Sequence, residues 1–156
     1  EMYLVIAPHV VSVSHLKEIL DKVKRPCIRY TEATEENVTQ ADCLIIDCYG
    51  LLSSIYRYGE ISYIGGGFGV GIHNVLEAAV YGIPVIFGPN NKKFREAQHL
   101  LEQKGGFEVT GYDDFKRLMD KFLSDEAYLQ QAGKAAGNYV NHNAGALEKI
   151  MKDITL

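Results

Sequence analysis

The sequence has no excess of positive charge, and this restricts its function first. Sixteen Lys and Arg are scattered among twenty Asp and Glu, so the formal net charge is -4. A nucleic-acid-binding surface needs basic side chains clustered on one face of the domain. We therefore expect no nucleic-acid partner.

Long apolar runs are missing, and cysteine is scarce. No stretch approaches the roughly 20 apolar residues that a membrane span needs, and we expect no signal peptide. The cysteines are odd in number, namely Cys27, Cys43 and Cys48, and two lie in or beside an apolar run. A free cysteine in such a place acts as a small hydrophobe. We expect a reducing, cytoplasmic setting and no transmembrane segment in this chain.

The chain also lacks internal repeats, low-complexity segments and linkers. Its 156 residues, 47% of them hydrophobic, are enough for one globular domain with its own core. We expect residues 1–156 to form a single domain. Because a strand-like run begins at Tyr3 and Glu1 stands in place of an initiator Met, we also expect this domain to be a piece of a longer protein.

Six short apolar runs alternate with helical patterns, which predicts a doubly wound α/β fold with about six parallel strands. The runs are nearly continuous in apolar residues, as in strands covered by helices on both faces. They begin at Tyr3, Cys27, Cys43, Ile61, Pro84 and Phe107. The expected helices are 14–23, 51–58, 73–81, 92–103 and 112–123, with a helical tail over 125–151 that has candidate breaks near Gly137 and at 143–145. Ligands of such sheets bind beyond the carboxyl ends of the strands.

Residues 64–82 read IGGGFGVGIHNVLEAAVYG, with five glycines between Gly65 and Gly71. A strand, a glycine loop and a helix in this order bring free backbone N–H groups and a helix N-terminus together, which favours a phosphate site. The dinucleotide fingerprint G-x-G-x-x-G fails in every register, and no GK[ST] of a P-loop is present. The alternative is a glycine-rich turn that only lets the helix pack close to the sheet.

The helix after the loop opens with three polar residues that we expect on one face: His73, Asn74 and Glu77. The Glu77 carboxylate can accept hydrogen bonds from two hydroxyls of a sugar or ribose, and the other two can contact an anion. Alternatively, Asn74 caps the helix and Glu77 is its capping-box partner.

Several separated motifs resemble one family. They are IAPH at 6–9, DCYGLL at 47–52, the glycine loop with HNVLEA up to residue 78, GIPVIFGP at 82–89 and NAGAL at 143–147. Together they resemble the GT-B glycosyltransferases, and within that class the 3-deoxy-D-manno-octulosonic acid (Kdo) transferases of lipopolysaccharide synthesis. The resemblance extends over nearly the whole chain and is strongest from Tyr63 to Ala97.

The resemblance implies a Rossmann-like C-terminal GT-B domain that binds the donor CMP-Kdo. The resemblance further implies that Glu77 holds the ribose hydroxyls, and that a second loop borders the nucleotide. The groups that bind the phosphate would be the backbone of Gly65, Gly66 and Gly67, together with His73 and Asn74. The loop that borders the nucleotide would be that of Pro8 and His9. It implies neither a metal nor another cofactor.

The rest of the enzyme would lie outside this chain. The resemblance implies a missing N-terminal domain that takes the lipid A precursor and carries the catalytic base, at the cytoplasmic face of the bacterial inner membrane. No catalytic residue is therefore expected in this chain, and the chain alone is expected to be inactive. Two departures stand out, since the loop at His9 lacks the family's Arg and Leu51 replaces a family Glu.

The segment after Pro89 supplies further candidates. The resemblance makes Asn91, Lys93 and Glu96 candidate contacts of the donor sugar, whereas a solvated helix face is the alternative reading of the lysines. The histidines stand singly, without a second ligand at zinc spacing, so we predict no metal site.

Two other functions remain open at the level of the residues. One is a GT-B transferase that uses a UDP-sugar, because Glu77 and the glycine loop would serve either donor. The other is a non-catalytic domain whose glycine loop binds phosphate or another small molecule.

Overall fold

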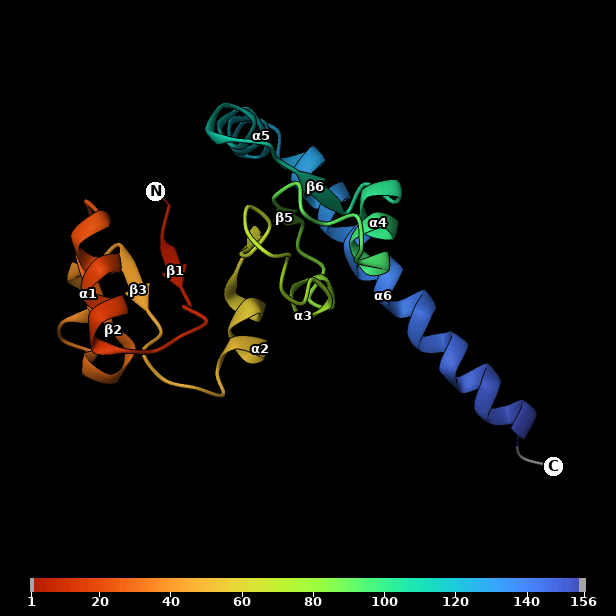
Figure 1. Cartoon of the computed structure of the whole chain (residues 1–156), viewed down its shortest axis with the longest axis horizontal. Helices are drawn as coiled ribbons and strands as arrows, with labels where there is room; N and C mark the ends of the chain where they lie inside the picture. The colour runs from red at the N-terminus through yellow and green to blue at the C-terminus, as the bar shows by residue number, and fades with distance from the viewer. Residues whose placement is uncertain (1, 155–156) are drawn as a thin grey trace. The chain divides into compact units, whose positions relative to one another are not determined.

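The chain divides into two compact units, Glu1–Ser54 and Ile55–Leu156. A computed structural model describes residues 2–154, with side chains up to Ala144 (Figure 1). Each unit is an α/β assembly around its own sheet. The prediction of a single domain over 1–156 stays a prediction.

The first unit is a three-stranded parallel sheet in the order β1-β3-β2. Ser12 caps α1, because its hydroxyl oxygen accepts a hydrogen bond from the backbone N–H of His15. Leu16 of α1 is buried against Cys43 and Ile45 of the central strand. The elements are β1 (Leu4–Ile6), α1 (Val13–Lys22), β2 (Cys27–Arg29), η1 (Tyr30–Glu32), η2 (Val38–Gln40) and β3 (Cys43–Ile45).

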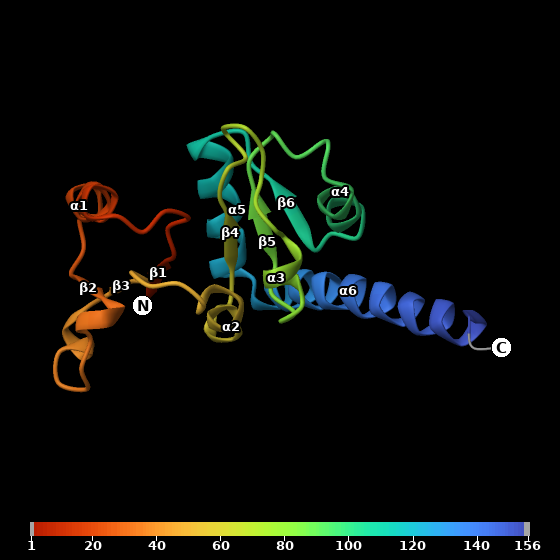
Figure 2. The ribbon, with the colours of Figure 1, turned by 60° about the horizontal axis from the view of Figure 1, so that its bottom comes forward.

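The second unit contains a parallel sheet in the order β4-β5-β6, with helices on both faces. Val85 and Phe87 of the central strand pack with α3 and α4, whereas Ile86 packs with α5, and all three side chains are fully buried. Figure 2 shows α4 and α5 on opposite sides of this sheet. The elements from residue 52 on are α2 (Leu52–Ile55), η3 (Tyr56–Tyr58), β4 (Ser62–Ile64), α3 (Leu76–Ala79), β5 (Val85–Phe87), α4 (Arg95–Glu102), β6 (Gly106–Glu108), α5 (Tyr112–Ser124) and α6 (Glu126–Ile154).

The predicted α/β class, the six parallel strands and the helical tail are confirmed. All six strands lie within or overlap the apolar runs. The expected burial on both faces holds for β5 but not for β1, in which Leu4 and Val5 are exposed. The strands are hydrogen-bonded as two sheets of three. No helix within residues 2–154 is long and apolar enough to cross a bilayer.

The expected breaks in the tail are wrong, because α6 is continuous from Glu126 to Ile154. Gly133 and Gly137 serve close packing instead. A Cβ atom on Gly137 would lie 3.2 Å from the Cα atom of Gly82, so the small residue lets α6 approach the turn after α3.

Two helices begin later than expected. The helix expected from His73 starts at Leu76, and the one expected from Lys92 starts at Arg95. At the first, the Asn74 side chain accepts a hydrogen bond from the N–H of Leu76, which stabilises a local turn in place of a helical one. At the second, Phe94 is extended, with φ -102° and ψ 102°. His73, Asn74 and Lys93 thus lie in loops.

Candidate functional site

The glycine loop lies between β4 and α3, and its carbonyl groups are engaged by the protein itself. The Gly65 carbonyl accepts a hydrogen bond from the N–H of His73 at 3.1 Å, and that of Gly66 accepts from Gly69 and Gly71 at 2.9 and 3.2 Å. Gly66 has φ 88°, a left-handed conformation that favours glycine. The loop is a folded turn held by its own backbone.

Several backbone N–H groups of the same loop, unlike its carbonyls, have no hydrogen-bond partner within the described residues. Within the described residues, the N–H groups of Gly66, Gly67, Phe68 and Val70 donate no hydrogen bond. Each belongs to a trans peptide, in which the N–H points away from the preceding carbonyl oxygen. Because the preceding carbonyls are engaged within the protein, these N–H groups point away from those contacts. Backbone N–H groups that have no acceptor in the protein can bind an anion.

Only part of the glycine content is explained by packing. A Cβ atom on Gly67 would lie 2.5 Å from the backbone nitrogen of Gly88, so the two chain segments touch at backbone level. Gly65 is different, because a Cβ atom there would meet only the Cδ2 atom of His73, at 3.8 Å. The packing-turn alternative therefore accounts for Gly67, whereas it leaves Gly65 unexplained.

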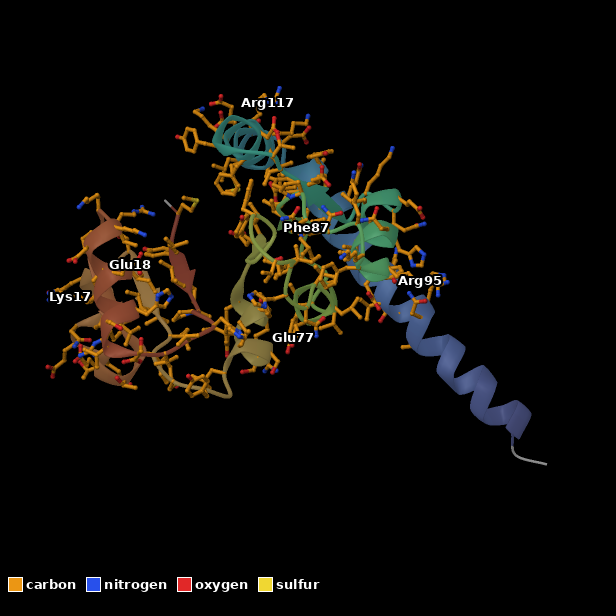
Figure 3. All side chains as sticks on the ribbon, in the orientation of Figure 1. Lys17, Glu18, Glu77, Phe87, Arg95 and Arg117 are labelled. Atoms are coloured by element: carbon orange, nitrogen blue, oxygen red, sulfur yellow. The ribbon has the colours of Figure 1, made fainter. Side chains whose placement is uncertain are left out.

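Glu77 and Asn74 interact directly beside the loop. The Asn74 Nδ2 group donates to Glu77 Oε1 at 3.1 Å. The other carboxylate oxygen, Oε2, accepts no hydrogen bond within the described residues, and Glu77 is half-buried on α3 (Figure 3). The capping-box alternative is not formed, because the N-cap of α3 is Val75, without a side-chain cap hydrogen bond, and Asn74 meets Glu77 side chain to side chain. One oxygen of Glu77 stays available for a hydroxyl group.

His73, a predicted site residue, and Tyr56, which was not predicted, differ in exposure. His73 is exposed, and its backbone N–H closes the glycine loop onto Gly65. Tyr56 of η3 is a neighbour that the sequence did not single out. Burial, and after it the charge of Glu77, raises the pKa of the Tyr56 hydroxyl, so that hydroxyl stays protonated at neutral pH and can donate a hydrogen bond.

The loop between β5 and α4 holds the glycine loop in place. The Asn90 backbone N–H donates to the Gly67 carbonyl at 2.8 Å, and the Asn90 side chain donates to the Gly69 carbonyl at 2.5 Å. Sequence reasoning did not single out Asn90. The signal was present, since asparagine after proline is typical of turns in which the side chain bonds to backbone groups.

The three predicted donor-sugar contacts are not equivalent. Asn91 is fully buried, with its side-chain nitrogen donating to the Gly88 carbonyl and to Glu108, and its oxygen accepting from Gln98. Lys93 and Glu96 are exposed, in the turn before α4 and in its first turn. Asn91 therefore serves a buried hydrogen-bond network, whereas the side chains of Lys93 and Glu96 are accessible to a ligand.

The remaining predicted site residues belong to the first unit. Pro8 is half-buried and His9 is exposed, in the loop after β1. After β3, Asp47 accepts hydrogen bonds from the N–H and hydroxyl of Thr31 at 3.0 and 2.6 Å. Burial acts to raise the pKa of the Asp47 carboxyl, but these hydrogen bonds outweigh it and the pKa is lowered.

Two hollows of the second unit do not coincide with the predicted site. One, of about 420 Å³, is lined by aromatic side chains of β4, the glycine loop and α5, and another, of about 820 Å³, lies over β6. None of the glycines 65–67, His73, Asn74 or Glu77 lines either one. Within the described residues, no group of three His, Cys, Asp or Glu side chains could hold a metal ion.

The chain is similar to curated enzymes from several bacteria. A 3-deoxy-D-manno-octulosonic acid transferase of Aquifex aeolicus (strain VF5) is 37% identical over 87 residues, which is 54% of this chain and 25% of that protein. One from Rickettsia felis is 27% identical over 164 residues, covering 99% of this chain and 34% of that protein. The predicted resemblance to Kdo transferases is confirmed. No family model matches the chain.

A solved structure supports the fold. The C-terminal CMP-Kdo binding domain of WaaA from Acinetobacter baumannii superimposes with a TM-score of 0.70, covering 90% of this chain and 89% of that domain. At 15% identity this likeness concerns the fold alone. The chain spans about a quarter to a third of the curated Kdo transferases named above.

Proposed function

We propose that this chain is the donor-binding part of a glycosyltransferase that moves Kdo from CMP-Kdo to a lipid A precursor in lipopolysaccharide biosynthesis. The observation that carries the proposal is the glycine loop, whose carbonyls are engaged within the protein while four of its N–H groups are not. Such a loop fits the phosphate of a nucleotide sugar. The similarity to Kdo transferases supports the choice of donor.

The proposed contacts follow the geometry of the loop. The backbone of Gly65, Gly66 and Gly67 receives the phosphate, with His73 and Asn74 beside it, and Glu77 accepts hydrogen bonds from the ribose hydroxyls. Since α3 has only four residues, the loop N–H groups supply the positive potential, and the contribution of the helix dipole is small. Pro8 and His9 border the nucleotide in this proposal, and Lys93 and Glu96 contact the sugar.

The chemistry is stabilisation of a leaving group. As the bond from Kdo to CMP breaks, negative charge grows on the phosphate and the sugar becomes oxocarbenium-like. N–H groups that are already oriented stabilise this charge without reorganisation. The catalytic base and the acceptor site belong to a separate N-terminal domain in this proposal, at the cytoplasmic face of the inner membrane, so the chain alone has no transferase activity.

Calorimetric titration with CMP, UMP, UDP and inorganic phosphate tests the proposal. We expect CMP to bind best, with a Kd near millimolar, about 4 kcal/mol of binding free energy. Glu77→Gln removes the charged acceptor of the ribose hydroxyls and is expected to weaken CMP binding about tenfold, roughly 1.4 kcal/mol. Binding of inorganic phosphate, which has no ribose, should be unchanged.

Glu102→Gln is the matched control, because it removes the same charge from the far end of α4, where the side chain is exposed. It should leave CMP binding unchanged. A preference for UDP would replace the proposal with a UDP-sugar transferase. Equal binding of phosphate and CMP, insensitive to Glu77→Gln, would instead indicate a non-catalytic phosphate-binding domain.

A further inference from the structure

The segment 88–94 contacts the glycine loop at four points. Gly88 touches Gly67 at backbone level, and the Asn90 N–H and side chain donate to the Gly67 and Gly69 carbonyls. The ring of Phe94 lies 2.9 Å from where a Cβ atom of Gly71 would be. Three of these contacts involve backbone atoms or a packed ring. The Asn90 side-chain amide is the contact made by an exposed polar side chain.

Each hydrogen bond from Asn90 fixes one peptide plane. Its backbone N–H holds the carbonyl of Gly67, and therefore the plane that carries the N–H of Phe68. Its side chain holds the carbonyl of Gly69, and therefore the plane that carries the N–H of Val70. In a trans peptide the carbonyl and the following N–H point in opposite directions, so both N–H groups are turned away from Asn90.

The 69–70 peptide has weaker support from its surroundings than the others. Val70 is fully exposed and Gly69 is exposed, and a Cβ atom on Gly69 would meet only the Gly66 carbonyl, at 3.6 Å. Packing therefore does not prevent this peptide from rotating. A full half-turn would bring Val70 to a positive φ, which a β-branched residue avoids. Without the Asn90 side chain, a smaller rotation would still turn the Val70 N–H away from its present direction.

We infer that Asn90 is a positioning residue for the phosphate: its side-chain amide holds the Gly69 carbonyl and so keeps the Val70 N–H directed at the anion. The inference rests on the proposed function in one respect, namely that the bound anion is a phosphate. The orientation itself is a property of the ligand-free chain, and it is measurable without any ligand.

The first experiment compares amide NMR spectra of the ligand-free chain and of Asn90→Ala. We expect shifts concentrated at Gly69 and Val70, with faster hydrogen exchange there, and an unfolding midpoint close to that of the original chain. Asn138→Ala is the matched control, since Asn138 is an exposed asparagine on α6, and it should leave these resonances unchanged. Unchanged Gly69 and Val70 resonances in Asn90→Ala would overturn the inference.

The second experiment titrates both variants with inorganic phosphate and with CMP. We expect Asn90→Ala to weaken the binding of both ligands about fivefold to tenfold, because one N–H of the anion site is lost. Glu77→Gln, in contrast, should weaken the binding of CMP alone. If the original chain binds neither ligand, the proposed function fails while the NMR comparison still decides the role of Asn90. If Asn90→Ala binds both as tightly as the original chain does, the inference is wrong and the proposed function stands.

Discussion

Gly67→Ala is expected to destabilise the second unit by about 3 kcal/mol, the upper end of the cost of overpacking a tight interior. The new Cβ atom would lie 2.5 Å from the backbone nitrogen of Gly88 and 2.6 Å from its Cα atom. Backbone atoms cannot rotate away as the end of a side chain can, so the glycine loop and the β5–α4 loop would have to separate. The measurement is the urea unfolding midpoint followed by circular dichroism.

Gly65→Ala is the matched control for this prediction. Its Cβ atom would meet only the Cδ2 atom of His73, at 3.8 Å, so the free energy of unfolding should change by less than about 0.5 kcal/mol. The same variant should weaken phosphate and CMP binding, because a methyl group would stand where the anion approaches the backbone. Equal midpoints for Gly67→Ala and the original chain would contradict the close contact of the two loops.

The elements of the fold were predictable because their signals are local. Each strand is a short apolar run such as that of Val85, Ile86 and Phe87, and all three side chains are fully buried as the pattern indicates. The starts of α3 and α4 were not predictable in the same way. Helical periodicity continues through Asn74, but the Asn74 side chain bonds to the Leu76 N–H and replaces the first helical turn.

The site residues likewise differ in whether their hydrogen-bond partners are near or far along the sequence. The glycine loop and the Asn74–Glu77 pair follow from sequence spacing, because their partners are within a few residues. The role of Asn90 was not predictable, since its partner Gly69 is 21 residues away and only the pairing of β4 with β5 brings the two loops together. Asn91 shows the converse case, in which a polar residue in a motif is engaged by the protein interior.

Asn91→Ala is expected to cost about 3 kcal/mol of stability, because it removes one fully buried amide that serves three partners. The Gly88 carbonyl and the Glu108 carboxylate would lose a donor, and the Gln98 side chain would lose an acceptor. A fall in the urea midpoint is the expected result. A role limited to the donor sugar would instead lower CMP affinity while the midpoint stays unchanged.

Asn91→Asp keeps the size and shape of the side chain but removes its N–H donors, so it tests the hydrogen bonds apart from the packing. A carboxylate there could still accept from Gln98, but it would face the Gly88 carbonyl and the Glu108 carboxylate, both of which are acceptors. Burial and the neighbouring negative charge would raise the pKa of the new carboxyl above its unfolded value. The free energy of unfolding is then retained at a pH below the pKa that the carboxyl has in the unfolded chain. It is lost as the pH rises through the higher pKa of the folded chain. Asn91→Asp should therefore approach the original chain in acid and fall below it at neutral pH, and a pH-independent difference would contradict the buried network.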